Sequence, residues 1–131
     1  MLSFSSPVLL YPDIDIYTRL SNRSIDKAKE LGYELQLFYI GVNNPEIAKE
    51  RIRNRVEKGG HNIADEIVEK RYYESLKNLK QAITKFDEVY LYDNSIKYKH
   101  IFSFINNKIL YKDKNVNWSK DAIEIIENKR I

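Results

Sequence analysis

Residues 33–46 read YELQLFYIGVNNPE, and this stretch decides the class of fold. Polar and apolar residues alternate at first, and from Leu37 to Val42 the run is apolar throughout. A strand that enters the middle of a sheet has this pattern. The last four residues, NNPE, supply a capping side chain, a proline for a first helical turn and an acid that favours the helix dipole. The stretch therefore predicts a buried strand followed at once by a helix.

The same reasoning applied outward along the chain predicts an α/β domain. Its architecture is a partial parallel sheet flanked by helices, with a C-terminal β-hairpin that turns at Asn106-Asn107. Gly32 is expected to end the helix that precedes the central strand. The further predicted elements are a short edge strand at 8–11, helices at 14–31, 45–58 and 62–86, a strand at 89–92, hairpin strands at 98–105 and 108–111, and a last helix at 119–129.

Composition excludes several classes of protein. The 131 residues suit one domain, and the absence of cysteine removes disulfides, thiolate metal sites and a cysteine nucleophile. A net charge of +3 is too small to indicate nucleic-acid binding, and the Tyr- and Lys-rich stretch at 97–112 fits a solvated hairpin as well. No apolar run approaches the roughly 20 residues of a membrane span, and the first residues do not resemble an export signal. We therefore expect a cytoplasmic protein without a membrane partner.

The four glycines, at positions 32, 41, 59 and 60, make no phosphate-binding loop. A P-loop needs two glycines five positions apart, followed by Lys and Ser or Thr, and a Rossmann fingerprint also needs spaced glycines. No pair in the sequence has either spacing. The sequence therefore contains no glycine-rich cradle for a nucleotide.

A row of cations marks the helix predicted after Pro45. Arg51, Arg55 and Lys58 lie along one side of the apolar stripe that begins at Ala48, whereas the helix's own acids point away from them. Such a row suits an anion such as a phosphate. The alternative is that these side chains cover apolar surface or pair with acids elsewhere.

Three further positions carry two interpretations each. Gly59-Gly60-His61 is either a helix cap and turn or a hinge beside a ligand. Arg71 either faces the same anion or makes an ordinary surface ion pair. Asp93-Asn94-Ser95 follows an apolar strand and is either a turn or part of the crevice where open parallel sheets bind ligands. No set of residues indicates a metal site.

These segments together resemble the zeta-toxin-like family of P-loop kinases. The resemblance rests on ERIRNRVEKGGHNIADEIVEKRYYESLKNL, preceded by AKELGYELQLFYIGVNNPE and followed by EVYLYDNS, and it covers about residues 25–118. It implies a P-loop-kinase-like sheet and lid helices at about 45–85. It also implies ATP or GTP with Mg²⁺ and a small-molecule substrate such as a nucleotide-activated amino sugar.

The resemblance further implies a role for each candidate residue. Arg51 and Arg55 would neutralise the transferred phosphoryl group, and Asp93, Asn94 and Ser95 would lie near the nucleotide. The remaining lid positions that would face the phosphates are Lys58, Gly59, Gly60, His61 and Arg71.

The sequence departs from the family where the nucleotide should be held. The Walker A strand, loop and helix have no counterpart in it, and Ser5-Ser6-Pro7 stands where the family has Phe-Glu-Thr. The prediction is therefore a single domain over 1–131 that corresponds to the C-terminal part of such a kinase and is inactive alone. The alternative is a non-enzymatic remnant or interaction module. The partners it would take are the absent N-terminal half, an antitoxin, or a second copy bound through an open sheet edge.

Overall fold

The computed structural model describes residues 2–4, 8–9, 25–60, 62–113 and 115–129. Of the predicted N-terminal elements, only Val8–Leu9 of the edge strand and residues 25–30 of the first helix are among them. The helical residues 25–30 end as predicted at Gly32, whose φ is +85°. The amide of Tyr33 then donates to the carbonyl of Ala28 at 3.1 Å, which closes the cap.

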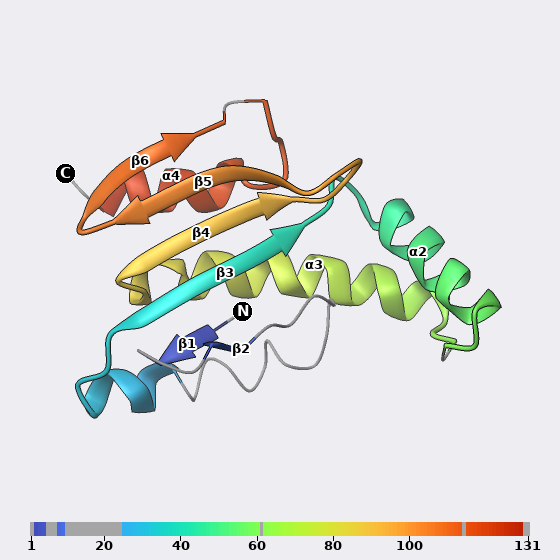
Figure 1. The fold of residues 1–131 in the computed structure, drawn as a ribbon, viewed down its shortest axis with the longest axis horizontal. Helices are drawn as coiled ribbons and strands as arrows, with labels where there is room; N and C mark the ends of the chain where they lie inside the picture. The colour runs from blue at the N-terminus through green and yellow to red at the C-terminus, as the bar shows by residue number, and fades with distance from the viewer. Residues whose placement is uncertain (1, 5–7, 10–24, 61, 114, 130–131) are drawn as a thin grey trace.

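One mixed sheet of six strands forms the centre of the molecule (Figure 1), in the order β2-β1-β3-β4-β5-β6. Only β3 and β4 run parallel, and the other ladders are antiparallel. The α/β class is confirmed, whereas the expected parallel sheet is corrected to a mixed one. The strands are β1 (Leu2–Phe4), β2 (Val8–Leu9), β3 (Leu35–Gly41), β4 (Glu88–Asp93), β5 (Lys99–Ile105) and β6 (Lys108–Lys112).

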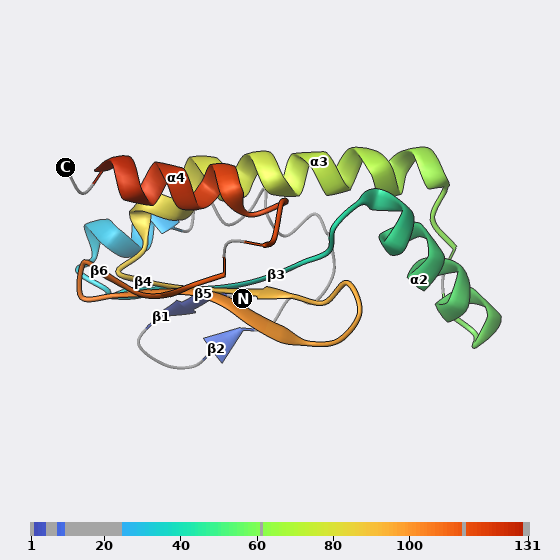
Figure 2. The same ribbon diagram turned by 90° about the horizontal axis from the view of Figure 1, so that it is seen from above.

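The long helices lie on one face of this sheet. Figure 2 shows α3 (Asp65–Ala82) and α4 (Lys120–Lys129) side by side above the strands, with the 3₁₀ turn η1 (Ile83–Lys85) leading from α3 into β4. Within the described part of the chain, no helix lies over the opposite face. The described part of the fold therefore has two layers. The wholly apolar run at 37–42 had instead suggested a strand that is buried on both faces.

The core fills the space between the sheet and these helices. Leu79 of α3, Leu91 of β4, Phe102 of β5 and Ile126 of α4 are all buried there. Tyr90 lies outside this core, stacked on Phe38 on the helix-free face. No helix among the described residues is long and apolar enough to cross a membrane.

The helix α2 (Pro45–Glu57) and the N-terminal half of α3 extend together beyond the carboxyl ends of β3 and β4 (Figure 1). We call this pair of antiparallel helices the arm. At 1.5 Å per residue the 18 residues of α3 span about 27 Å, which is long enough to serve both arm and core. The two predicted lid helices are thus confirmed as helices, the second of them continuous with the core.

Candidate functional site

The carboxyl ends of the two parallel strands bring two loops together. Gly41 and Asp93 are paired at the end of the ladder, and the amide of Asn94 donates to the carbonyl of Gly41 at 2.9 Å. Because both strands end at the same edge of the sheet, the residues that follow them become neighbours there. The predicted Asp93-Asn94-Ser95 segment therefore lies beside the start of α2.

Asp93 organises this edge through its carboxylate. Oδ1 accepts hydrogen bonds from Trp118 Nε1 at 2.9 Å and from the Ser95 hydroxyl at 2.8 Å, and Oδ2 accepts from the Ser95 amide at 3.3 Å. The Ser95 hydroxyl in turn accepts from the Asn43 amide at 2.9 Å. One carboxylate thus ties the loop after β4 to the loop after β3 and to the segment before α4.

Trp118 was not among the residues that sequence reasoning selected. Its ring is 9% exposed and covers Gly41, where a Cβ atom would come within 2.6 Å of the ring. The ring also lies 5.6 Å from the ring of Tyr39. The only signal in the sequence was that the chain's single tryptophan precedes a predicted helix, and no motif connects it to Asp93.

Arg51 links the arm to the same loop. The helix α2 begins as predicted, with the Asn44 side chain accepting from the Ile47 amide at 3.0 Å and with Pro45 in the first turn. From this helix Arg51 donates from Nη2 to the carbonyl of Asn94 and, at 3.2 Å, to that of Ser95. Because these carbonyl acceptors carry no formal charge, they do not neutralise the positive charge of Arg51.

The cations on the two sides of α2 have different surroundings. Lys49 and Arg53 pair across the arm with acids of α3, at 3.5 Å to Glu69 and 3.1 Å to Asp65. Arg53 is exposed, as the helical pattern predicts, but it is also paired. The two ion pairs that join α2 to α3 thus lie on the inner seam of the arm.

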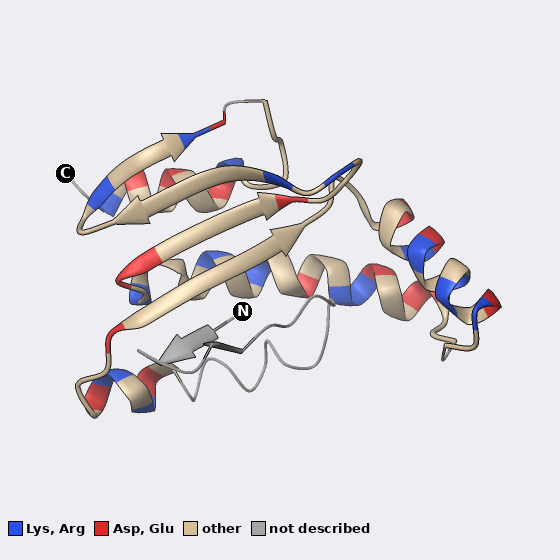
Figure 3. Cartoon of the chain, viewed as in Figure 1, with Lys and Arg blue, Asp and Glu red and all other residues tan. Residues whose placement is uncertain are grey.

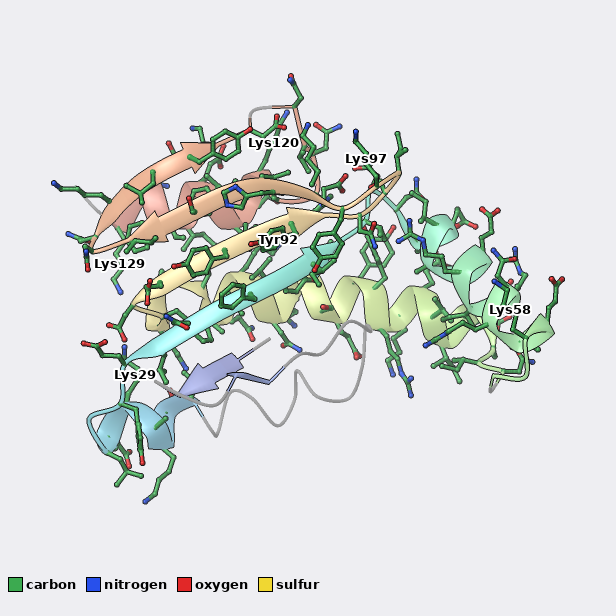
Figure 4. All side chains as sticks on the ribbon, in the orientation of Figure 1. Lys29, Lys58, Tyr92, Lys97, Lys120 and Lys129 are labelled. Atoms are coloured by element: carbon green, nitrogen blue, oxygen red, sulfur yellow. The ribbon has the colours of Figure 1, made fainter. Side chains whose placement is uncertain are left out.

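That row does not form a compact cluster. The Arg51 side chain reaches back to the loop after β4, whereas Lys58 is exposed at the far tip of the arm (Figure 4). Their separation of seven positions in the sequence corresponds to a rise of about 10 Å along a helix. Figure 3 shows both signs of charge along the arm. Arg55, which is exposed, lies between these two residues. Because Arg51 and Lys58 are this far apart, they suit an extended anion better than a single phosphate.

Gly59 and Gly60 close the C-terminus of α2. The Gly59 amide donates to the Val56 carbonyl at 3.0 Å and the Gly60 amide to the Arg55 carbonyl at 2.7 Å, a pairing that ends many helices. Gly59 has φ of +94°, and a Cβ on Gly60 would meet the Arg55 carbonyl oxygen at 2.9 Å. Local geometry therefore accounts for both glycines. His61 lies outside the described residues.

Replacing Gly59 with alanine is expected to lower the free energy of unfolding by about 1 kcal/mol, because an alanine in a left-handed conformation is strained. Nothing lies within 4 Å of the added methyl group, so a clash makes no contribution. Urea denaturation followed by circular dichroism would measure the change. An unchanged midpoint would show that the backbone at Gly59 is not held in this conformation in solution.

Arg71 is half-buried on α3. Within the described ranges it makes no hydrogen bond or ion pair, and none joins it to the loop after β4. The structure therefore brings Arg51 and residues 93–95 together and does not add Arg71 to that contact.

Two tyrosines fix α3 against the end of β3. Tyr72 donates its hydroxyl to the Val42 carbonyl at 2.8 Å, and the hydroxyls of Tyr39 and Ser75 are 2.7 Å apart. Burial raises the pKa of Tyr39 to about 12, and desolvation, with smaller effects of Tyr73 and Asp93, raises that of Tyr72 to about 12. Both hydroxyls therefore keep their protons, and they hold the arm at a set angle to the sheet.

The described residues include no group of three or more His, Asp or Glu side chains that could hold a metal ion by themselves. Both oxygens of the Asp93 carboxylate accept hydrogen bonds, from Trp118 and Ser95. The cations at this end of the sheet suit phosphate groups.

A cavity of about 270 Å³ lies at the other end of the sheet. Its lining includes Phe86 and Asp87 before β4, Phe104 and Asn107 of the hairpin, and Lys129 of α4. It shares no residue with the site at the carboxyl ends of β3 and β4.

The fold and this site define an α/β protein with a cation-bearing helical arm beside the carboxyl ends of two parallel strands. The sequence model of the zeta toxin family matches residues 18–117, and the chain belongs to that family. An uncharacterized protein of Haemophilus influenzae (strain ATCC 51907 / DSM 11121 / KW20 / Rd) is 53% identical over 45 residues. The match spans about a third of each protein, 34% of this chain and 32% of the relative. No solved structure matches the chain.

Proposed function

We propose that this chain forms the lid and acceptor half of an ATP- or GTP-dependent phosphotransferase of the zeta toxin kind. The substrate would be a small molecule such as a nucleotide-activated amino sugar. The observation that carries the proposal is the contact between Arg51 of the arm and the carbonyls of Asn94 and Ser95. It supports the placement of cations from a helical arm beside the loop at the carboxyl end of a parallel strand, where α/β proteins bind ligands.

The two arginines have different tasks in this proposal. Arg55 is exposed on the arm and would contact a phosphate directly, with Lys58 further out along the same row. Arg51 would set the loop after β4 in place and add its positive charge from there. Electrostatic stabilisation and positioning are the main contributions of a protein to phosphoryl transfer, so these tasks account for the acceptor side of such a site.

The nucleotide side must come from a segment with a P-loop. Backbone amides and a lysine hold the β- and γ-phosphates in kinases of this type, and a Ser or Thr of the loop holds the metal. Since the sequence has no such loop, we propose that the chain works together with a polypeptide that provides it.

The arginines can be tested with the chain's own tryptophan, which is hydrogen-bonded to Asp93. We expect MgATP, MgGTP and inorganic triphosphate to change Trp118 fluorescence in a saturable way. Arg55→Ala should weaken this binding about tenfold, the effect of losing one charge-assisted contact.

Arg53→Ala is the matched control, because Arg53 lies on the other side of α2 and pairs with Asp65. It should change the affinity less than about twofold. Titration calorimetry on the same samples would exclude a fluorescence artefact. Equal losses in the two variants, or no saturable binding in the wild type, would contradict the proposal.

The non-enzymatic alternative is favoured by one observation, namely that the Arg51 guanidinium already has acceptors in the protein itself. An assay of phosphate transfer from ATP to a UDP-amino sugar distinguishes the proposed phosphotransferase from the non-enzymatic alternative. We expect no transfer by the chain alone and transfer after a P-loop polypeptide is added. Transfer by the chain alone, above an Arg51→Ala/Arg55→Ala double variant, would show that the P-loop segment is not required.

A further inference from the structure

The face of the sheet opposite the helices carries a continuous set of aromatic rings. We call it the aromatic face; its residues are Phe38, Tyr90, Tyr92, Tyr98, His100 and Tyr111. Figure 4 shows the labelled Tyr92 on the side of the sheet toward the viewer, with α3 behind the strands. Tyr98 and Tyr111 are 57% and 45% exposed, and the other four rings are half-buried.

Four of the rings form two stacked pairs. The ring centroids of Phe38 and Tyr90 are 4.5 Å apart, with planes only 20° from parallel, and those of His100 and Tyr111 are 5.2 Å apart at 23°. Adjacent strands are about 4.8 Å apart, so each pair is stacked face to face across neighbouring strands. Stacking therefore covers one face of each of these four rings.

These contacts bear on the kind of partner. A single-stranded nucleic acid stacks its bases on exposed ring faces, and stacking within each pair already covers one face of both rings. Tyrosine-rich patches with few charges at their centre are instead typical of protein–protein interfaces. Glu88 and His100 lie at opposite ends of this patch, one at the start of β4 and the other at the start of β5.

We propose that the aromatic face binds a second copy of this chain, sheet face against sheet face. A two-fold axis across the strands would place the Glu88 end of each copy opposite the end that carries His100 and, in the adjoining turn, Lys97. A two-fold axis along the strands would oppose Glu88 to Glu88. Charge complementarity therefore favours the first arrangement.

Self-association through the β6 edge of the sheet, one form of the edge pairing that the sequence first suggested, is opposed by charge. The edge strand β6 runs from Lys108 to Lys112, and antiparallel pairing centred on Leu110 would place Lys108 of each copy opposite Lys112 of the other, which is paired with Glu127. Lysines on edge strands commonly prevent such pairing. The face, not the β6 edge, is thus the surface assigned to the second copy.

The size of the face sets the strength of the dimer. Four strands about 4.8 Å apart and about six residues long cover about 400 Å² in each copy. The two copies together would bury about 800 Å², below the roughly 1,200 Å² of stable complexes, so we expect a reversible, micromolar dimer.

Sedimentation velocity over the micromolar range tests this directly. The wild type should pass from monomer to dimer as its concentration rises, and Tyr92→Lys should stay monomeric because it puts a charge at the centre of the face. Tyr111→Lys, at a more exposed ring of the same face, is a second variant in case the first does not fold. Tyr73→Lys is the matched control, since Tyr73 is 56% exposed but lies on the arm.

The variants also separate the face from the edge. Leu110→Lys, on β6, should leave the dimer intact, whereas Lys97→Glu should weaken it by removing the charge opposite Glu88. A wild type that remains monomeric, or a dimer that Leu110→Lys breaks and Tyr92→Lys does not, would overturn the proposal. Binding of a labelled single-stranded oligonucleotide that competes with self-association would also overturn it.

Discussion

Asp93→Ala is expected to lower the free energy of unfolding by about 3 kcal/mol, because hydrogen bonds to a charged acceptor contribute about 1.5–3 kcal/mol each. The carboxylate accepts from Trp118 Nε1, from the Ser95 hydroxyl and from the Ser95 amide. Its removal leaves the indole N–H without this acceptor and separates the two loops that it joins. Urea denaturation and the emission maximum of Trp118, which should shift to the red, would measure the effect.

Asp65→Ala is a suitable comparison for this variant. Asp65 is an exposed carboxylate with a single surface ion pair, to Arg53, so its loss should cost less than about 1 kcal/mol. Asp93→Asn keeps an acceptor oxygen and should fall between wild type and Asp93→Ala. If Asp93→Ala were no more destabilising than Asp65→Ala, the carboxylate would not hold this edge together in solution.

Gly41→Ala is expected to destabilise the protein by about 2 kcal/mol through overpacking. A Cβ at this position would lie 2.6–2.7 Å from three atoms of the Trp118 ring, which is held by its bond to Asp93 and cannot move away cheaply. The cause differs from that at Gly59, where the backbone conformation alone disfavours alanine.

A double-mutant cycle tests this cause. In Trp118→Leu the ring is absent, so Gly41→Ala should be nearly neutral in that background, although Trp118→Leu is itself destabilising. Thermal or urea unfolding of the four proteins gives the coupling free energy. Additive effects of the two substitutions would show that the ring and Gly41 do not touch.

Local rules predicted the elements that local geometry decides. The strand at Leu35–Gly41, the Asn44 cap of α2 and the glycine caps at Gly32 and Gly59 all follow from residues within a few positions of one another. The predicted hairpin also turns at Asn106 and Asn107, which both have positive φ. Such features depend on backbone conformation and short-range hydrogen bonds, which the sequence shows directly.

The partners of the candidate residues could not be predicted in the same way. Arg51 bonds to carbonyls more than 40 residues further along the chain, and Trp118 reaches Asp93 from 25 residues away. Backbone carbonyls are present at every position, so no residue pattern marks them as acceptors. Arg53 pairs with Asp65 because α3 returns along α2, and residue spacing within α2 does not show this contact.

The sequence by itself determined the α/β class, the order of the main elements, the cationic row of α2 and the membership of the zeta toxin family. Each depends on residue type and spacing, which are properties of the chain alone. Only the tertiary structure decided that the sheet is mixed, that aromatic rings line its face opposite α3 and α4, and that Arg51 and Trp118 hold opposite sides of the loop after β4. These features depend on which distant segments pack together, and that is set by the core as a whole.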